Sequence, residues 1–166
     1  MRLEALNLLD RSSFAAELGW VFEHSPWVAE RAWDSRPFSN FQQLHMSMVQ
    51  QVELGAPDEQ LALLRAHPDL GTRAKLSDAS AFEQAGAGLD QLTRDEFALF
   101  MTLNEGYKKK FGFPFLFAVK GSEKHDILEA LERRLPALPE DEYAEALRQV
   151  YRIAEFRLRD YLNQES

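Results

Sequence analysis

Apolar side chains recur at intervals of three and four residues along almost the whole chain, and this spacing constrains the fold more than any other feature. It places the apolar side chains on one face of a helix, where another helix can cover them. The chain shows no convincing apolar-polar alternation of a half-buried strand, no internal repeat and no low-complexity linker. The spacing therefore predicts an all-α fold, a single-domain helical bundle.

Residues that commonly cap helices mark where most of the expected helices begin and end. The first helix follows 10-DRSS-13, and the next begins at Pro26 with Ser25 as its cap. The other expected helices run from Phe41 to the residue before Gly55, from Pro57 to Ala66, from the Thr93-x-x-Glu96 capping box to Gly112, from Ser122 to Leu135 and from Glu140 to Leu162.

The stretch 111-FGFPFLFAVKG-121 departs from this pattern because it is almost wholly apolar, bracketed by glycines and divided by Pro114. Proline lacks a backbone donor, which argues against a central strand. We expect one buried extended loop at about 111–121. Any amide of this loop that the protein leaves without a partner is available to a ligand.

Composition narrows the classes of partner. The 166 residues suit one domain, and 27 acidic against 19 basic residues give a formal net charge of -8. This charge argues against nucleic acid and against an anionic membrane surface as partners. The chain has no cysteine and no apolar run of roughly 18 residues. We expect a cytoplasmic protein whose partner is a small molecule or another protein.

His67 is the first of three places where polar residues interrupt the helical pattern. In 64-LRAHPDLGTRAKLS-77 the proline disfavours helical geometry at the residue before it, so the helix should end there and project the imidazole. The ring is then a candidate functional group. The alternative is a capping histidine that bonds the last carbonyls of the helix.

The second place is 80-SAFEQAGAGLD-90, where Ser80 and Glu83 stand in capping-box register and Gln84 follows. A capping box alone explains the serine and the glutamate, with Gly86 and Gly88 ending a short helix. The glycines also allow the backbone to approach a ligand closely. Both interpretations remain open from the residues alone.

The third place is Arg157, which falls on the apolar stripe of the last helix. A guanidinium in a core cannot lose its charge, so it must meet a carboxylate, carbonyl groups or an anionic ligand. An internal ion pair, with Glu83 or another acid, and a ligand-binding role are both open. No metal-ligand spacing and no nucleotide-binding motif is present, so we expect neither an obligatory metal nor a nucleotide.

Several blocks together resemble the family of 2-oxo-4-hydroxy-4-carboxy-5-ureidoimidazoline (OHCU) decarboxylases of urate breakdown. These blocks are 19-GWVFEHSPWVAERAWDSRPF-38, 67-HPDLG-71, 80-SAFEQAGAGL-89, 103-LNEGYKKKFGFPFLFAVKG-121 and 152-RIAEFRL-158. The resemblance implies one OHCU decarboxylase-like domain over residues 1–166. It also implies an all-helical homodimer that converts OHCU to (S)-allantoin and CO2 without metal or organic cofactor.

The resemblance also implies the residues of the active site. His67 and Glu83 correspond to the catalytic residues. The residues that correspond to substrate-binding positions are Pro68, Ser80, Gln84, Leu116, Phe117, Ala118, Val119 and Arg157.

Two other functions are compatible with the same residues. One is a ureido- or imidazole-acting hydrolase that uses His67 and Glu83 as base and acid. The other is a non-catalytic helical module that binds a protein through exposed aromatic side chains. Release of CO2 distinguishes the decarboxylase from the hydrolase.

Overall fold

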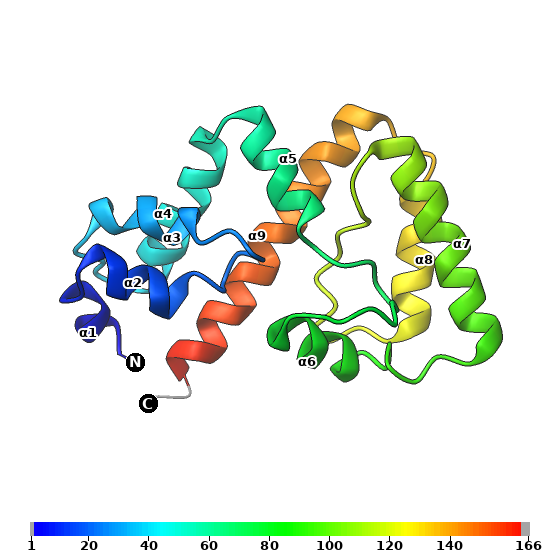
Figure 1. Cartoon of the computed structure of the whole chain (residues 1–166), viewed down its shortest axis with the longest axis horizontal. Helices are drawn as coiled ribbons and strands as arrows, with labels where there is room; N and C mark the ends of the chain where they lie inside the picture. Colours follow the sequence, from blue (N-terminus) through cyan, green and yellow to red (C-terminus); the bar gives the residue numbers. More distant parts are fainter. Residues whose placement is uncertain (1, 164–166) are drawn as a thin grey trace. The chain divides into compact units, whose positions relative to one another are not determined.

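The computed structural model describes residues 2–163, which contain nine α-helices, one short 3-10 helix and no strand (Figure 1). The prediction of an all-α fold is confirmed. The helices are α1 (Leu3–Asn7), α2 (Arg11–Leu18), α3 (Trp27–Ala32), η1 (Trp33–Ser35), α4 (Phe41–Leu54), α5 (Pro57–Arg65), α6 (Asp78–Gly86), α7 (Arg94–Phe111), α8 (Lys124–Arg134) and α9 (Pro139–Asn163).

The chain forms two compact units. The first contains the residues up to Ala66 together with those from Tyr151 onward, and the second runs from His67 to Val150. Helix α9 therefore contributes its beginning to the second unit and its end to the first. No helix among the described residues is both long enough and apolar enough to cross a membrane.

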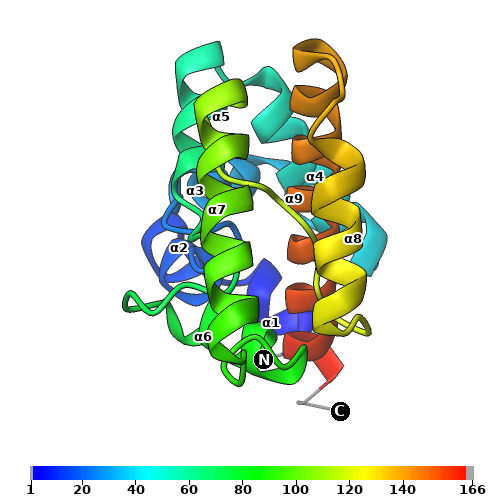
Figure 2. The same cartoon turned by 90° about the vertical axis from the view of Figure 1, so that its right-hand side faces the viewer.

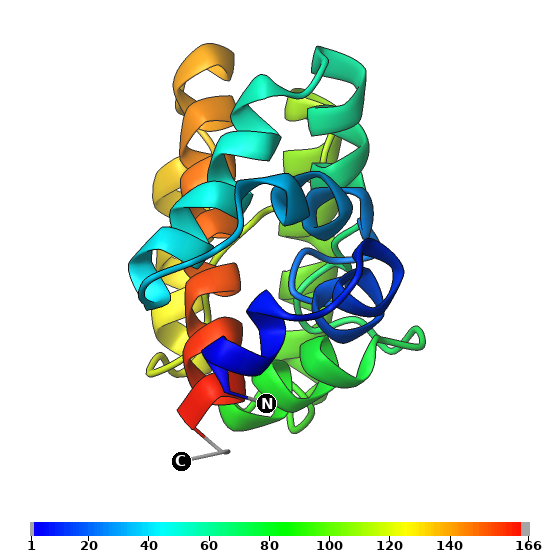
Figure 3. The ribbon, with the colours of Figure 1, turned by 90° about the vertical axis from the view of Figure 1, so that its left-hand side faces the viewer.

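The first unit is built from α1 to α5 and the end of α9 (Figure 3). Helix α4 begins where Asn40 accepts a hydrogen bond from the backbone of Gln43 at 2.9 Å, and it ends at Gly55, as predicted. The ring of His45 on α4 bonds the carbonyl of Tyr151 on α9 at 2.9 Å. The fully buried core of this unit includes Phe14, Leu18, Val28, Leu44, Met48, Val52, Ala154 and Leu158.

Helix α3 begins one residue later than predicted. Pro26 is its cap residue, and the hydroxyl of Ser25 donates to the carbonyl of Glu23 at 2.9 Å instead of capping the helix. Ser25 is buried, so its hydroxyl needs this partner.

The second unit contains α6 to α8 and the beginning of α9 (Figure 2). At the start of α7, the backbone of Glu96 donates to the Thr93 hydroxyl and the backbone of Thr93 donates to the Glu96 carboxylate. The helix ends at Gly112, whose φ of 83° is left-handed. The capping box and the C-terminal glycine were both predicted from the sequence.

Helix α8 begins later than predicted, with Glu123 and not Ser122 at its cap position. The backbone of Glu123 donates to the Asp126 carboxylate at 3.0 Å. The backbone of Ser122 instead donates to the carbonyl of Val119, which closes the turn after the extended segment.

The extended segment runs from the end of α7 to the start of α8 (Figure 2) and has neither helical nor strand hydrogen bonding. Phe113, Phe115, Leu116 and Ala118 are at most 4% exposed. The predicted buried extended loop at about 111–121 is therefore confirmed. Its backbone groups need partners other than a neighbouring strand.

Candidate active site

His67 lies directly after the end of α5, as the sequence predicted. The helix stops at Arg65, and the backbone of Ala66 closes its last turn by bonding the carbonyl of Ala62 at 2.9 Å. The proline that follows His67 cannot continue a helix. His67 itself is 8% exposed, so its ring is shielded from bulk solvent.

One peptide group beside His67 is held at both of its polar atoms. The carbonyl of Leu70 accepts from Asn104 Nδ2 of α7 at 2.9 Å. The N–H of Gly71 donates to Gln84 Oε1 of α6 at 3.0 Å. Both side-chain amides are buried. Because the two bonds act on the same peptide plane, they fix the turn after His67 in both position and rotation.

The same turn also requires a glycine. Gly71 has a φ of +77°, and a Cβ built on it lies 2.9 Å from Leu92 Cδ1. Lys108 of α7 adds an ion pair with Asp69 at 2.8 Å. Helices α6 and α7 together therefore hold the 67–71 turn.

Helix α6 carries three of the expected site residues, and its start differs from the sequence interpretation. Ser77 is the cap, and its hydroxyl oxygen accepts from the backbone of Ser80 at 3.2 Å. The alternative in which Ser80 itself caps the helix is therefore wrong. Ser80 lies inside α6 and is buried together with Gln84, one turn further on, while Glu83 is half-buried.

The segment from Leu116 to Val119 is held by side chains from two helices. The carbonyl of Leu116 accepts from Arg134 Nη1 at 2.6 Å, and the N–H of Ala118 donates to Gln149 Oε1 at 2.9 Å. This is the part of the chain whose backbone groups were expected to meet a ligand.

Arg157 is 6% exposed and has an acidic partner within the first unit. Its Nη2 bonds Glu23 Oε2 at 2.8 Å, and its Nη1 approaches the carbonyls of Trp20 and Val21 at 3.2 and 3.4 Å. The prediction that a core-facing arginine must meet a carboxylate or carbonyl groups is confirmed. The acid is Glu23, from the block 19-GWVFEHSPWVAERAWDSRPF-38.

The expected site residues are thus divided between the two units. The second unit contains all of them except Arg157, which the first unit contains. Within the second unit, Gln84 links the 67–71 turn to α6. The meeting of Arg157 with the other residues stays a prediction.

The sequence interpretation missed four polar residues that support these segments. Asn104 could have been found, because it is a polar residue on the apolar stripe of α7. Arg134, Glu142 and Gln149 had no comparable signal, since charged and amide residues are frequent on helix surfaces. All four are buried here.

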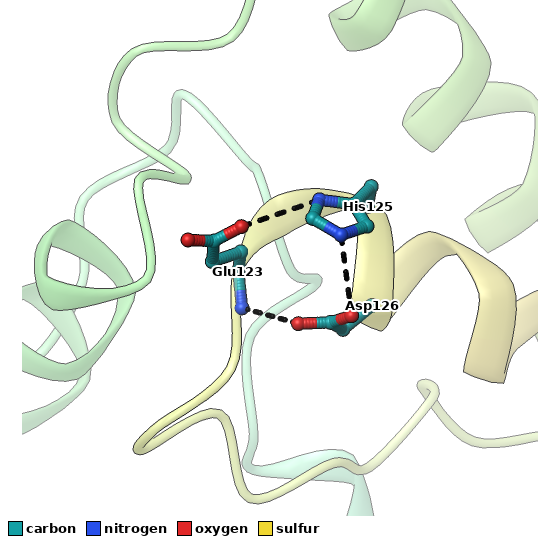
Figure 4. A group of neighbouring side chains, drawn as sticks. All are labelled: Glu123, His125 and Asp126. Carbon is teal, nitrogen blue, oxygen red and sulfur yellow. Dashed lines mark hydrogen bonds and ion pairs between the residues drawn. The ribbon is translucent and has the colours of Figure 1, made fainter.

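One group of possible metal ligands occurs among residues 2–163, at the start of α8 (Figure 4). Both nitrogens of His125 face carboxylates, at 3.5 Å from Glu123 and 3.3 Å from Asp126. All three residues are exposed and nearly consecutive. The contacts of one imidazole with two carboxylates that neighbour it in the chain explain this geometry, and we assign no metal to it.

Comparison with known proteins connects these features to a family. The model of the OHCU decarboxylase family matches residues 7–159. A 2-oxo-4-hydroxy-4-carboxy-5-ureidoimidazoline decarboxylase of Haloferax volcanii is 47% identical over 165 residues, covering 99% of this chain and 98% of that protein. The corresponding human protein, named as a putative decarboxylase of the same kind, is 35% identical and is matched over 96% of its length.

Solved structures agree with these sequence matches. A crystal structure of (S)-allantoin synthase superposes with a TM-score of 0.79 at 33% identity, covering 96% of this chain and 54% of that one. An OHCU decarboxylase crystallised in the presence of (S)-allantoin shares the fold, with a TM-score of 0.69 at 23% identity.

The fold and these matches define an all-helical enzyme of the decarboxylase class. The chain belongs to the OHCU decarboxylase family.

Proposed function

We propose that this chain forms a single OHCU decarboxylase domain. This domain converts OHCU to (S)-allantoin and CO2 in the degradation of urate. The observation that carries the proposal is the 47% identity to the Haloferax volcanii decarboxylase over nearly the full length of both chains. The arrangement of the second unit supports it, because the 67–71 turn, α6 and the extended segment are each held by buried polar contacts.

The reaction determines what the site must provide. The bond between the ring carbon and its carboxylate breaks and CO2 leaves. The released electron pair forms a C=C bond to the neighbouring carbon, and the π pair of the C=N bond moves to the ring nitrogen, which takes up a proton. The hydroxyl on the same carbon loses its proton as a carbonyl forms. A proton is then added to the neighbouring carbon that carries the ureido group, which becomes the stereocentre. Because the ring itself accepts the electrons, the chemistry needs no organic cofactor or metal.

The candidate residues match these requirements. His67 takes the hydroxyl proton or steers the carboxylate toward departure, and Glu83 orients the imidazole or relays the proton that sets the S configuration. Arg157 anchors anionic or carbonyl oxygens of the substrate, since a guanidinium presents two parallel donors. Ser80 fixes the ring, and backbone amides of the extended segment stabilise the charge that develops on it.

The hydrogen bond between Gln84 and the 67–71 turn supports a role for this side chain in substrate binding. Its Oε1 is occupied by the N–H of Gly71. Its Nε2 makes no hydrogen bond to any residue in the described range. Gln84 is therefore oriented to donate to a carbonyl oxygen, which suits a substrate rich in urea and lactam carbonyls.

A chiral product assay tests the proposed function. OHCU is generated fresh, and the allantoin formed with and without the protein is separated by chirality while CO2 release is recorded. We expect an excess of (S)-allantoin with stoichiometric CO2, against racemate from the spontaneous reaction. Conversion without CO2 indicates the hydrolase instead, and racemate formed at the spontaneous rate rejects both enzymes.

We also infer a cytoplasmic homodimer that uses neither metal nor organic cofactor. The family resemblance supports the dimer, and the absence of cysteine suits a reducing compartment. Sedimentation at several protein concentrations tests the dimer. Activity that survives exhaustive chelation and dialysis supports the cofactor-independent reaction, and activity that returns only on adding a metal contradicts it.

A further inference from the structure

Two side chains hold the extended segment at residues two positions apart. Arg134, in the last turn of α8, donates to the carbonyl of Leu116 at 2.6 Å. Gln149 of α9 accepts from the N–H of Ala118 at 2.9 Å. We refer to Arg134 and Gln149 as the backbone clamp.

The arginine of the clamp is itself tightly held. Glu142 accepts from Arg134 Nε at 2.7 Å, and the hydroxyl of Tyr107 donates to the same carboxylate oxygen. The guanidinium carbon lies 4.5 Å from the centre of the Phe115 ring. Arg134, Glu142 and Tyr107 are all at most 8% exposed. Burying such an ion pair is costly, and several hydrogen bonds are needed to offset the desolvation.

The spacing of the two bonds determines where the other backbone groups point. In extended backbone, successive residues direct their N–H and C=O groups to opposite sides, so Leu116 and Ala118 face the clamp together. Phe117 and Val119 must then direct their N–H groups away from it. Neither N–H makes a hydrogen bond to any residue between positions 2 and 163, although Val119 is only 6% exposed.

We propose that Arg134 and Gln149 are positioning residues that hold the N–H groups of Phe117 and Val119 as preorganised donors for the substrate. This inference rests on the proposed decarboxylation, in which negative charge develops on the ring as CO2 leaves. Donors that are already oriented stabilise such charge without reorganising during the reaction. The Arg134, Glu142 and Tyr107 network serves to keep this orientation fixed.

Two variants of Gln149 test the clamp: one removes the acceptor of the Ala118 N–H, and the other keeps it. Gln149→Met removes the acceptor for Ala118, while Gln149→Glu keeps an oxygen at the same place. Removing one donor of this kind costs about 10²–10³-fold in kcat. Because the clamp only orients donors, we expect a smaller loss, about 10- to 100-fold in kcat, for Gln149→Met. KM should change less than kcat. Gln149→Glu should recover part of the activity, because its second oxygen replaces the Nε2 that donates to the Glu145 carboxylate at 3.4 Å.

Arg134→Lys tests the other side of the clamp, with Arg133→Lys as a matched control on the next residue of α8. Arg133 is exposed, so its replacement should leave kcat unchanged. In Arg134→Lys a single ammonium group replaces the separate N–H donors that reach the Glu142 carboxylate and the Leu116 carbonyl. The extended segment is then held less firmly, so kcat should fall. A lower Tm with wild-type kcat in both Arg134→Lys and Gln149→Met overturns the positioning role and leaves a purely structural one.

Amide hydrogen exchange tests the clamp without relying on activity. The N–H of Ala118 is protected by Gln149, so its exchange should accelerate in Gln149→Met and stay slow in Gln149→Glu. Amides in the middle of α7 provide the internal reference. Unchanged exchange at Ala118 contradicts the clamp, whereas a wild-type protein that does not convert OHCU contradicts the proposed function instead.

Discussion

Arg157 is held by partners far away in the sequence. Its carboxylate partner, Glu23, lies 134 positions earlier, and both side chains are buried. A buried charge of this kind is strongly destabilising when its partner is removed. The pair therefore supports the fold of the first unit, while the planar guanidinium retains the geometry that suits an anionic or carbonyl-rich ligand.

Replacing Arg157 with lysine separates these two roles. Arg157→Lys keeps the charge opposite Glu23 but loses the planar fork. We expect KM for OHCU to rise with only a small loss of stability, measured by steady-state kinetics and thermal melting on the same preparation. A Tm lower by several degrees with unchanged kinetics means that Arg157 serves only the internal ion pair.

His67 is the residue on which the proposed proton transfer depends most. His67→Asn keeps a polar side chain at the end of α5 but removes the titratable ring. A general acid or base contributes roughly 10²–10⁴-fold, so kcat should fall by that order while the circular dichroism spectrum is unchanged. Turnover at the wild-type rate removes His67 from the mechanism.

At the scale of elements, α7 contributes polar side chains to several parts of the second unit. It supplies Asn104 to the 67–71 turn, Lys108 to Asp69, and Tyr107 to the Glu142 network. Its capping box is reinforced by Lys124, which donates to the Glu96 carboxylate at 2.8 Å. This bond, together with the one from the Thr93 backbone, lowers the pKa of Glu96 below its usual value.

A pair of threonine substitutions tests the cap of α7. Thr93→Ala removes the side chain that accepts from the Glu96 backbone, and such losses cost about 1 kcal/mol. Thr102→Ala, in the exposed middle of the same helix, is the matched control and should be neutral or slightly stabilising, since alanine is the better helix former. Urea titration of both variants measures the difference. Equal free energies of unfolding contradict a role for the cap.

At the scale of the whole molecule, carboxylates that accept hydrogen bonds link stability to pH. The backbone of Ser13 lowers the pKa of Asp10, and the Arg31 hydrogen bond, followed by the Ala56 backbone, lowers the pKa of Glu59 to about 2. A carboxyl group whose pKa is lower in the folded state stabilises the protein above its unfolded pKa. That contribution is lost as the pH falls through the folded value.

The Glu59→Gln variant measures this linkage directly. Glu59 has an unfolded reference pKa of 4.5 and a folded pKa of about 2. We expect the variant to be less stable than the wild type above pH 4.5 and the difference to shrink toward pH 2. Chemical denaturation at several pH values gives the two curves. A difference that does not depend on pH shows that the Arg31 pair does not stabilise the ionised form of Glu59.

Much of the helical architecture could be read from the sequence because its signals are local. The caps of α4 and α7 and the glycine that ends α7 act within about one helical turn, so neighbouring residues suffice to predict them. The same locality explains the error at α6. Ser77 and Ser80 are both competent caps, and propensity alone does not choose between them.

The sequence by itself determined the all-helical class, the bounds of α4 and α7, the break before Pro68 and the buried extended segment between α7 and α8. Only the tertiary structure decided which distant groups meet: Glu23 with Arg157, Asn104 and Gln84 on one peptide group, and Arg134 and Gln149 on the extended segment. Capping depends on residues within about one helical turn. The partner of a buried charge or amide depends on which helix faces reach it after the chain has packed.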